Sequence, residues 1–161
     1  MMTIGPITSR AVLAFAALLG FSFGACADQD SRGQRQPRLP KYTQECASCH
    51  IAYPPGMLPA SSWQRLMTGL PRHFGADASL DATSVKELST WLAANAGTGN
   101  RVREAPPEDR ITRSAWFTRE HDEVPPAAWK HPTVKSPSNC SACHAQADQG
   151  DFNERHVRIP R

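Results

Sequence analysis

Two hexapeptides, ECASCH at residues 45–50 and NCSACH at residues 139–144, repeat the pattern Cys-x-x-Cys-His within a chain of 161 residues. The chain has five cysteines, and four of them belong to these two motifs. The fifth, Cys26, lies in an apolar N-terminal region. The repeated motif therefore dominates the chemistry that this chain can perform.

The pattern Cys-x-x-Cys-His is the attachment signature of a c-type haem. Residues three apart on a helical turn project from nearly the same face, so both thiols can reach the two vinyl groups on one edge of a flat ring. The next residue, His50 or His144, then places its imidazole over the iron as the proximal ligand. We predict two covalently attached c-type haems, bound through Cys46, Cys49, Cys140 and Cys143.

Paired cysteines also occur in zinc sites and in redox-active thiol pairs. Two Cys-x-x-Cys pairs could supply four zinc ligands, but the histidine directly after each pair would then be accidental. A thioredoxin-like pair is expected beside a βαβ pattern, which neither motif has. Two haem sites account for every residue of the repeated motif.

The composition is poor for an ordinary core of side chains. Aromatic residues make up 7% of the chain, and 14 prolines and 10 glycines interrupt the apolar pattern. Since a small chain buries a limited share of its surface, a bound cofactor would supply part of the missing apolar bulk. No clear strand pattern is present. We expect a mostly α fold with extensive irregular loops, built as two small haem-centred lobes.

The N-terminal region has the features of an export signal. Arg10 is the one charged residue before Asp28, an apolar run follows it, and residues 25–27 form a small-x-small cleavage site. The apolar run is shorter than the roughly 20 residues of a membrane-spanning helix, which disfavours a retained anchor. Lipid attachment at Cys26 is also disfavoured, because Phe23 stands where lipoprotein signals prefer leucine.

Cleavage near Ala27 implies export, and we expect a periplasmic location. Changes in composition then divide the rest of the chain into lobes and polar connections. The predicted segments are a signal peptide at 1–27, a flexible mature N-terminus at 28–40, an N-terminal haem lobe at 41–97, a linker at 98–110 and a C-terminal haem lobe at 111–161.

Helical spacing and capping residues predict several short helices. These cover residues 43–50, 61–70, 81–96, a stretch within 111–124, and 139–149. The expected caps are Thr43 for the first helix, serines 61 and 62 for the second, and Ser138 or Asn139 for the last. Gly97 and Gly150 should end the third and last helices, and the proline pair at 125–126 the fourth.

The second axial position of each iron decides between electron transfer and ligand binding. Four histidines remain as candidates for it: His73, His121, His131 and His156. Their positions favour His73 and His121 only mildly, because isolated histidines are usually at the surface. Met57 is a rival for the first iron, whereas Met67 lies on an apolar stripe where core packing is its expected role.

Four stretches resemble the small exported dihaem cytochromes c of proteobacteria: CASCHIAYPPGMLPASSW (46–63), HFGADASLD (73–81), ITRSAWFTREHDEV (111–124) and SNCSACHAQADQGDFNERHVRIP (138–160). The resemblance covers nearly the whole chain from Tyr42 to Pro160. It implies a cytochrome c-like electron carrier with bis-histidine haems. It also implies His73 and His121 as the distal ligands, leaving open which of the two haems each one serves.

We therefore expect an electron-transfer protein and not an enzyme, with His50, His73, His121 and His144 as iron ligands. Bis-histidine ligation lacks the methionine that raises the potential of other cytochromes c. The alternative is a haem protein with one open iron, acting as a peroxidase or as a sensor of small ligands.

The formal net charge of +3 gives no pattern typical of nucleic-acid binding, and we expect no nucleic-acid partner. The resemblance implies redox proteins as partners, such as a b-type membrane cytochrome or an oxygen-binding cytochrome c, with membrane contact only through the partner. Basic side chains gather in sequence around the second motif and could steer an acidic partner: Lys130, Lys135, Arg155, Arg158 and Arg161.

Overall fold

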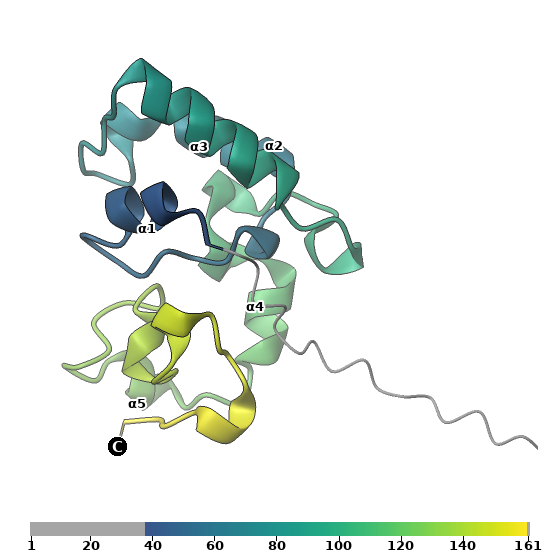
Figure 1. The fold of residues 1–161 in the computed structure, drawn as a ribbon. Helices are drawn as coiled ribbons and strands as arrows, with labels where there is room; N and C mark the ends of the chain where they lie inside the picture. Colours follow the sequence, from purple (N-terminus) through teal and green to yellow (C-terminus); the bar gives the residue numbers. More distant parts are fainter. Residues whose placement is uncertain (1–37, 161) are drawn as a thin grey trace, which may run out of the picture. The chain divides into compact units, whose positions relative to one another are not determined.

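The computed structural model describes residues 38–160, and within that range the chain forms short helices, turns and loops but no strand. The α-helices are α1 (Pro40–Cys46), α2 (Ala60–Thr68), α3 (Ala82–Ala94), α4 (Ala115–Glu120) and α5 (Pro126–Trp129) (Figure 1). The prediction of a mostly α, loop-rich fold is confirmed. The predicted signal peptide and most of the predicted flexible N-terminus lie outside the described residues.

The helix before the first motif differs from the prediction. It covers Pro40–Cys46 rather than 43–50, so Thr43 lies inside it instead of capping it. Pro40 stands at its first position, where no backbone N–H is needed. The N–H of Ala47 donates to the Thr43 carbonyl and closes the helix, which leaves Cys49 in the turn that follows.

The predicted helix through the second motif is also wrong. Two 3₁₀ turns replace it, at Cys140–Ala142 and Ala147–Gln149, and Gly150 follows in the left-handed region with φ 78°. The side chain of Asn139 does not cap the first turn. Its amide nitrogen instead donates to two carbonyl oxygens of the preceding loop, which orients the side chain toward that loop.

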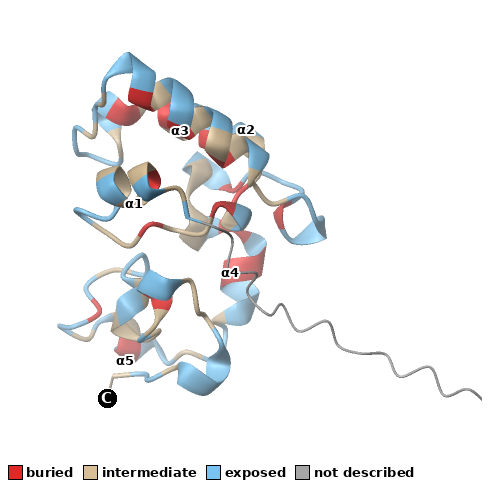
Figure 2. Cartoon of the chain, viewed as in Figure 1, coloured by how far each residue is buried: buried red, intermediate tan, exposed pale blue. Residues whose placement is uncertain are grey.

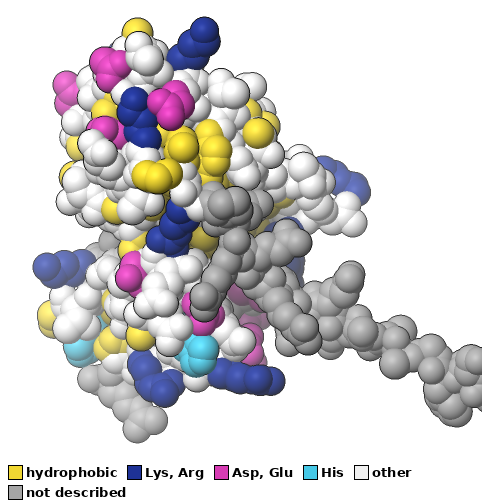
Figure 3. Space-filling view, in the orientation of Figure 1, with side chains coloured by type: hydrophobic (Ala, Val, Ile, Leu, Met, Phe, Trp, Pro, Cys, Tyr) yellow, Lys and Arg dark blue, Asp and Glu magenta, His cyan; other side chains and the backbone are white. Residues whose placement is uncertain are grey.

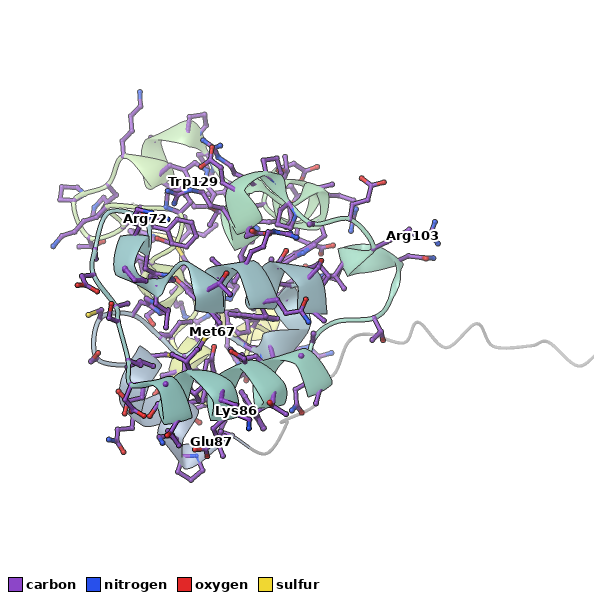
Figure 4. The ribbon with its side chains drawn as sticks, turned by 90° about the horizontal axis from the view of Figure 1, so that it is seen from above. Met67, Arg72, Lys86, Glu87, Arg103 and Trp129 are labelled. Atoms are coloured by element: carbon purple, nitrogen blue, oxygen red, sulfur yellow. The ribbon has the colours of Figure 1, made fainter. Side chains whose placement is uncertain are left out.

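Helices α2 and α3 lie side by side and supply four of the eight buried residues of the larger apolar cluster, Trp63, Met67, Leu88 and Leu92 (Figure 1). Met67 lies between them, whereas Lys86 is on the outer side of α3 (Figure 4). Leu88 and Leu92 of α3 are 0% and 1% exposed, and buried residues line the inner sides of both helices (Figure 2). The spacing of apolar residues therefore predicted these two helices correctly.

The serine cap predicted for α2 is wrong, and α3 has a cap that was not predicted. Pro59, and not a serine, is the N-cap of α2 and makes no side-chain capping hydrogen bond. Asp81 caps α3 by accepting from the N–H groups of Thr83 and Ser84. The carboxylate thus satisfies donors that a helix start leaves without partners.

The predicted linker, residues 98–110, packs against both neighbouring parts of the chain. Val102 is 4% exposed and contacts Trp116 and Phe117 of α4. Asp109 accepts two hydrogen bonds from the Arg65 guanidinium of α2, at 2.8 and 2.6 Å. The division into two lobes stays a prediction.

Helix α4 contains the buried residues Trp116 and Phe117 but ends earlier than expected. It stops at Glu120, and Pro126 opens the additional helix α5 instead of ending α4. The Ser114 hydroxyl caps α4 by accepting from the Phe117 N–H. Of the helices in residues 38–160, none combines the length and apolar character needed to cross a membrane.

Gly97 allows the end of α3 to lie against the loop after the first motif. Its N–H donates to the Leu58 carbonyl at 2.9 Å. A Cβ atom at this position would lie 2.5 Å from the Gly56 carbonyl oxygen and would overlap the Val102 side chain. The backbone approach therefore requires glycine.

We expect Gly97→Ala to lower the free energy of unfolding by about 1–3 kcal/mol, the usual cost of overpacking. Gly99→Ala is the matched control, because a Cβ there would meet nothing within 4 Å. Chemical denaturation of both holoproteins, followed by circular dichroism, measures the difference. Equal stability of the two variants would contradict the close approach at Gly97.

Candidate functional site

Two histidines from separate segments face each other beside the first motif. The rings of His50 and His73 have centres 6.2 Å apart, and their planes differ by 28°. His50 follows the turn after α1, and His73 follows the 3₁₀ turn Leu70–Arg72. Both imidazoles are half-buried.

A second pair lies beside the second motif. The rings of His121 and His144 have centres 6.1 Å apart, and their planes differ by 72°. His121 comes directly after the end of α4. His144 is held by a backbone bridge to Val157, and the Arg158 N–H donates to the neighbouring Cys143 carbonyl at 2.9 Å.

The two separations fit a metal ion between the rings. Imidazoles that bind one ion from opposite sides, each through a bond of about 2 Å, have ring centres roughly 6 Å apart. The structure thus brings His73 to the proximal histidine His50, and His121 to the proximal histidine His144. Each predicted distal histidine lies beside the motif nearer to it in sequence.

Hydrogen bonds at Nδ1 set the tautomer of one histidine in each pair. Nδ1 of His50 donates to the Ile51 carbonyl at 2.6 Å, and Nδ1 of His121 donates to the Phe117 carbonyl at 2.8 Å. With the proton on Nδ1, Nε2 keeps the lone pair that a metal requires. In these two imidazoles Nδ1 is thus occupied by a hydrogen bond, and Nε2 is the nitrogen available to a metal.

The other histidine of each pair has a different environment. Nδ1 of His73 and Nδ1 of His144 are buried and have no hydrogen-bond partner within residues 38–160. Burial lowers the pKa of both imidazoles, and the nearby His50 and His121, respectively, lower it further. Both rings are thus held in the neutral form that can bind a metal.

The remaining candidates do not face a proximal histidine. Nδ1 of His131 accepts a hydrogen bond from the Thr133 N–H at 3.3 Å. Nδ1 of His156 pairs with an oxygen of Asp151 at 2.8 Å, at the surface. Met57, the rival for the first iron, packs in the cluster of Val102 and its aromatic neighbours.

Within residues 38–160, none of the four motif cysteines forms a disulfide. Burial raises the pKa of Cys46 and of Cys140 to about 11, and it also raises the pKa of Cys143. A redox-active thiol pair requires a lowered pKa, so these thiols lack that character. Nowhere in the described part of the chain do three or more His, Cys, Asp or Glu side chains form a site for a bare metal ion.

Residues of both motifs line the same two cavities. A cavity of about 180 Å³ is lined by Cys49 and His50 from the first motif and by Asn139 and Cys140 from the second. A larger one of about 530 Å³ also has lining residues from both motifs. The two attachment segments therefore adjoin each other.

Three aromatic residues at the histidine pairs were not identified from the sequence. Tyr53 stacks on His50 with ring centres 4.8 Å apart, Trp129 lies 5.9 Å from His121, and Phe152 lies 5.3 Å from His144. The one sequence feature that could have indicated such a contact is the position of Tyr53, three residues after His50. Phe117 also stacks on His121, with ring centres 4.0 Å apart.

The residues present fit two c-type haems. Each motif offers a cysteine pair and a proximal histidine, and a second imidazole lies at metal-bridging distance from each proximal one. Besides the two histidine Nδ1 atoms, the one buried side-chain polar atom without a partner in residues 38–160 is Nε1 of Trp116. Two of these three unsatisfied atoms thus belong to the histidine pairs.

Comparison with known proteins agrees with this site. The sequence profile of the dihaem cytochrome c family matches residues 42–152. The comparison with curated proteins gives no match. Among solved structures, the chain is similar to the dihaem cytochrome c of Shewanella baltica OS155, with 39% identity, a TM-score of 0.68, and coverage of 78% of this chain and 95% of that one.

It is also similar to the dihaem cytochrome c purified from Rhodobacter sphaeroides, with 43% identity, a TM-score of 0.63, and coverage of 72% of this chain and 98% of that one. A second structure of a dihaem cytochrome c from Rhodobacter sphaeroides gives 43% identity and a TM-score of 0.64. With its two Cys-x-x-Cys-His motifs for two c-type haems, this chain belongs to the dihaem cytochrome c family.

Proposed function

We propose that this protein carries electrons between redox partners in the periplasm, and that histidine occupies both axial positions of each haem. The observation that supports this function is the pair of ring separations, 6.2 Å for His50 and His73 and 6.1 Å for His121 and His144. Filled axial positions leave an iron able to accept and release electrons but not to bind a substrate.

Haem iron supplies reversible one-electron chemistry when it is bound. The chain's own residues then determine how readily an electron is taken up. Two neutral imidazoles, without the methionine that raises the potential in other cytochromes c, favour a low reduction potential. The aromatic rings of Phe117 and Trp129 pack on His121, and Tyr53 packs on His50, which keeps both ligands in place.

Optical spectroscopy of the purified holoprotein tests this function. We expect two covalent haems per chain, reversible reduction of both, and low-spin spectra that carbon monoxide does not change in the reduced state. A high-spin signal in the wild-type protein, or binding of carbon monoxide to one haem, would favour the alternative of an open iron in a peroxidase or sensor.

The proposed ligands predict a selective effect of histidine substitutions. We expect His73→Ala and His121→Ala each to convert one of the two haems to high spin, because each removes one axial ligand. His131→Ala and His156→Ala are the controls and should leave both haems low spin, since neither ring faces a proximal histidine. A high-spin haem in either control would show that the ligand assignment is wrong.

For the partner, we propose an acidic redox protein that docks near the second haem. Lys and Arg side chains are spread over the part of the surface formed by the C-terminal residues (Figure 3). In the described part of the chain, Lys130, Lys135, Arg155 and Arg158 form no ion pair with an acidic side chain. Their charge is therefore available to steer a partner of opposite charge.

Electrostatic steering has a characteristic salt dependence. We expect electron transfer to an acidic redox protein to slow as ionic strength rises, because exposed charges are screened beyond about 10 Å at 0.1 M salt. The double variant Lys130→Glu, Lys135→Glu should slow transfer at low salt. Lys86→Glu, an exposed charge reversal on the outer side of α3, is the control. A rate indifferent to salt and to both variants would rule out docking at this surface.

A further inference from the structure

Tyr53 contacts both haem sites, although it belongs to neither motif. Its ring stacks on the imidazole of His50, with ring centres 4.8 Å apart and planes 22° apart. Its hydroxyl donates to the Ser138 carbonyl at 2.8 Å, across 85 positions of sequence. Ser138 stands two residues before Cys140. One side chain thus connects the proximal ligand of the first site with the attachment segment of the second.

Hydrogen bonds within the segment around Ser138 hold it in one conformation. The Asn139 amide donates to the carbonyl oxygens of Thr133 and Val134, at 3.2 and 3.1 Å. The Ser138 hydroxyl lies 2.8 Å from that of Ser136. Because these bonds hold the loop together, a shift of Ser138 would move Cys140 with it.

The backbone of Tyr53 makes a separate contact within the first site. Tyr42 of α1 is 3% exposed, and its hydroxyl donates to the Tyr53 carbonyl at 2.7 Å.

We propose that Tyr53 is the positioning residue that couples the two haem sites. Its ring sets the plane of the His50 imidazole, and its hydroxyl holds the Cys140 segment against the first site. The distance between the sites and the orientation of the first axial ligand then depend on one side chain. This inference rests on the proposed function, because coupling matters when both irons exchange electrons.

Three holoprotein variants separate the two contacts of Tyr53. Tyr53→Phe removes the hydroxyl and keeps the ring, whereas Tyr53→Leu removes both. Tyr42→Phe is the matched control, because it removes a hydroxyl whose hydrogen bond stays within the first site. The readouts are amide hydrogen exchange at residues 142–144, the two midpoint potentials, and electron paramagnetic resonance of the ferric protein.

We expect Tyr53→Phe to speed exchange at residues 142–144 by roughly 2- to 10-fold, the factor that corresponds to the loss of one hydrogen bond. It should also lower the potential of the second haem, because a looser segment admits more solvent. The resonance signal of the first haem should stay unchanged. Tyr53→Leu should additionally alter that signal, since the plane of His50 is no longer held.

Tyr42→Phe should leave exchange at residues 142–144 and the second potential as in the wild type. The proposal is overturned if Tyr53→Phe behaves like Tyr42→Phe in both readouts. Should Tyr53→Leu fail to accumulate, Tyr53→Phe alone decides. Failure of the electron-carrier function would be visible separately, as a high-spin haem in the wild-type protein.

Discussion

Each haem site depends on one geometric constraint, that a histidine from a distant segment faces the proximal histidine with ring centres about 6 Å apart. In the first site this requires an unusual backbone after His73. Phe74 and Gly75 both have positive φ, at 50° and 98°, and the Ala76 N–H donates back to the His73 carbonyl. The left-handed conformation of Phe74 costs of order 1–3 kcal/mol. Arg110 lies over the Phe74 ring at 4.2 Å and supports the turn.

The two sites differ in which histidine of the pair has a hydrogen bond at Nδ1. In the first, the motif histidine His50 has the Nδ1 hydrogen bond, and the facing His73 does not. In the second, the facing His121 has that bond, and the motif histidine His144 does not. A hydrogen bond at Nδ1 orients an imidazole and increases its basicity as a ligand. The ring planes also differ between the sites, by 28° in the first pair and 72° in the second. The two haems should therefore be unequal in potential and in spectrum.

The sequence predicted the chemistry of this protein better than its local structure. The motif spacing implied both haems, and the helical spacing of apolar residues predicted α2 and α3. The helices expected through the motifs were wrong, because Pro40 starts α1 early and the Asn139 side chain bonds to the preceding loop. Such competition between a cap and a loop contact depends on tertiary structure, which propensity does not report.

Contacts between distant segments could not be predicted from the sequence either, because they too depend on tertiary structure. The hydrogen bond from Tyr53 to Ser138 spans most of the described chain, and no local sequence pattern indicates it.

Buried hydrophobic residues are unevenly distributed along the described chain, which explains why contacts between distant segments matter. The cluster around α2 and α3 contains eight buried hydrophobic residues, whereas the cluster at α4 contains three. After α4, the buried hydrophobic side chains of the described chain are those of Ala128, Val134 and Ala147. Residues of this size bury little apolar surface, so the C-terminal part depends on the covalently attached ring and on its contacts with the first site.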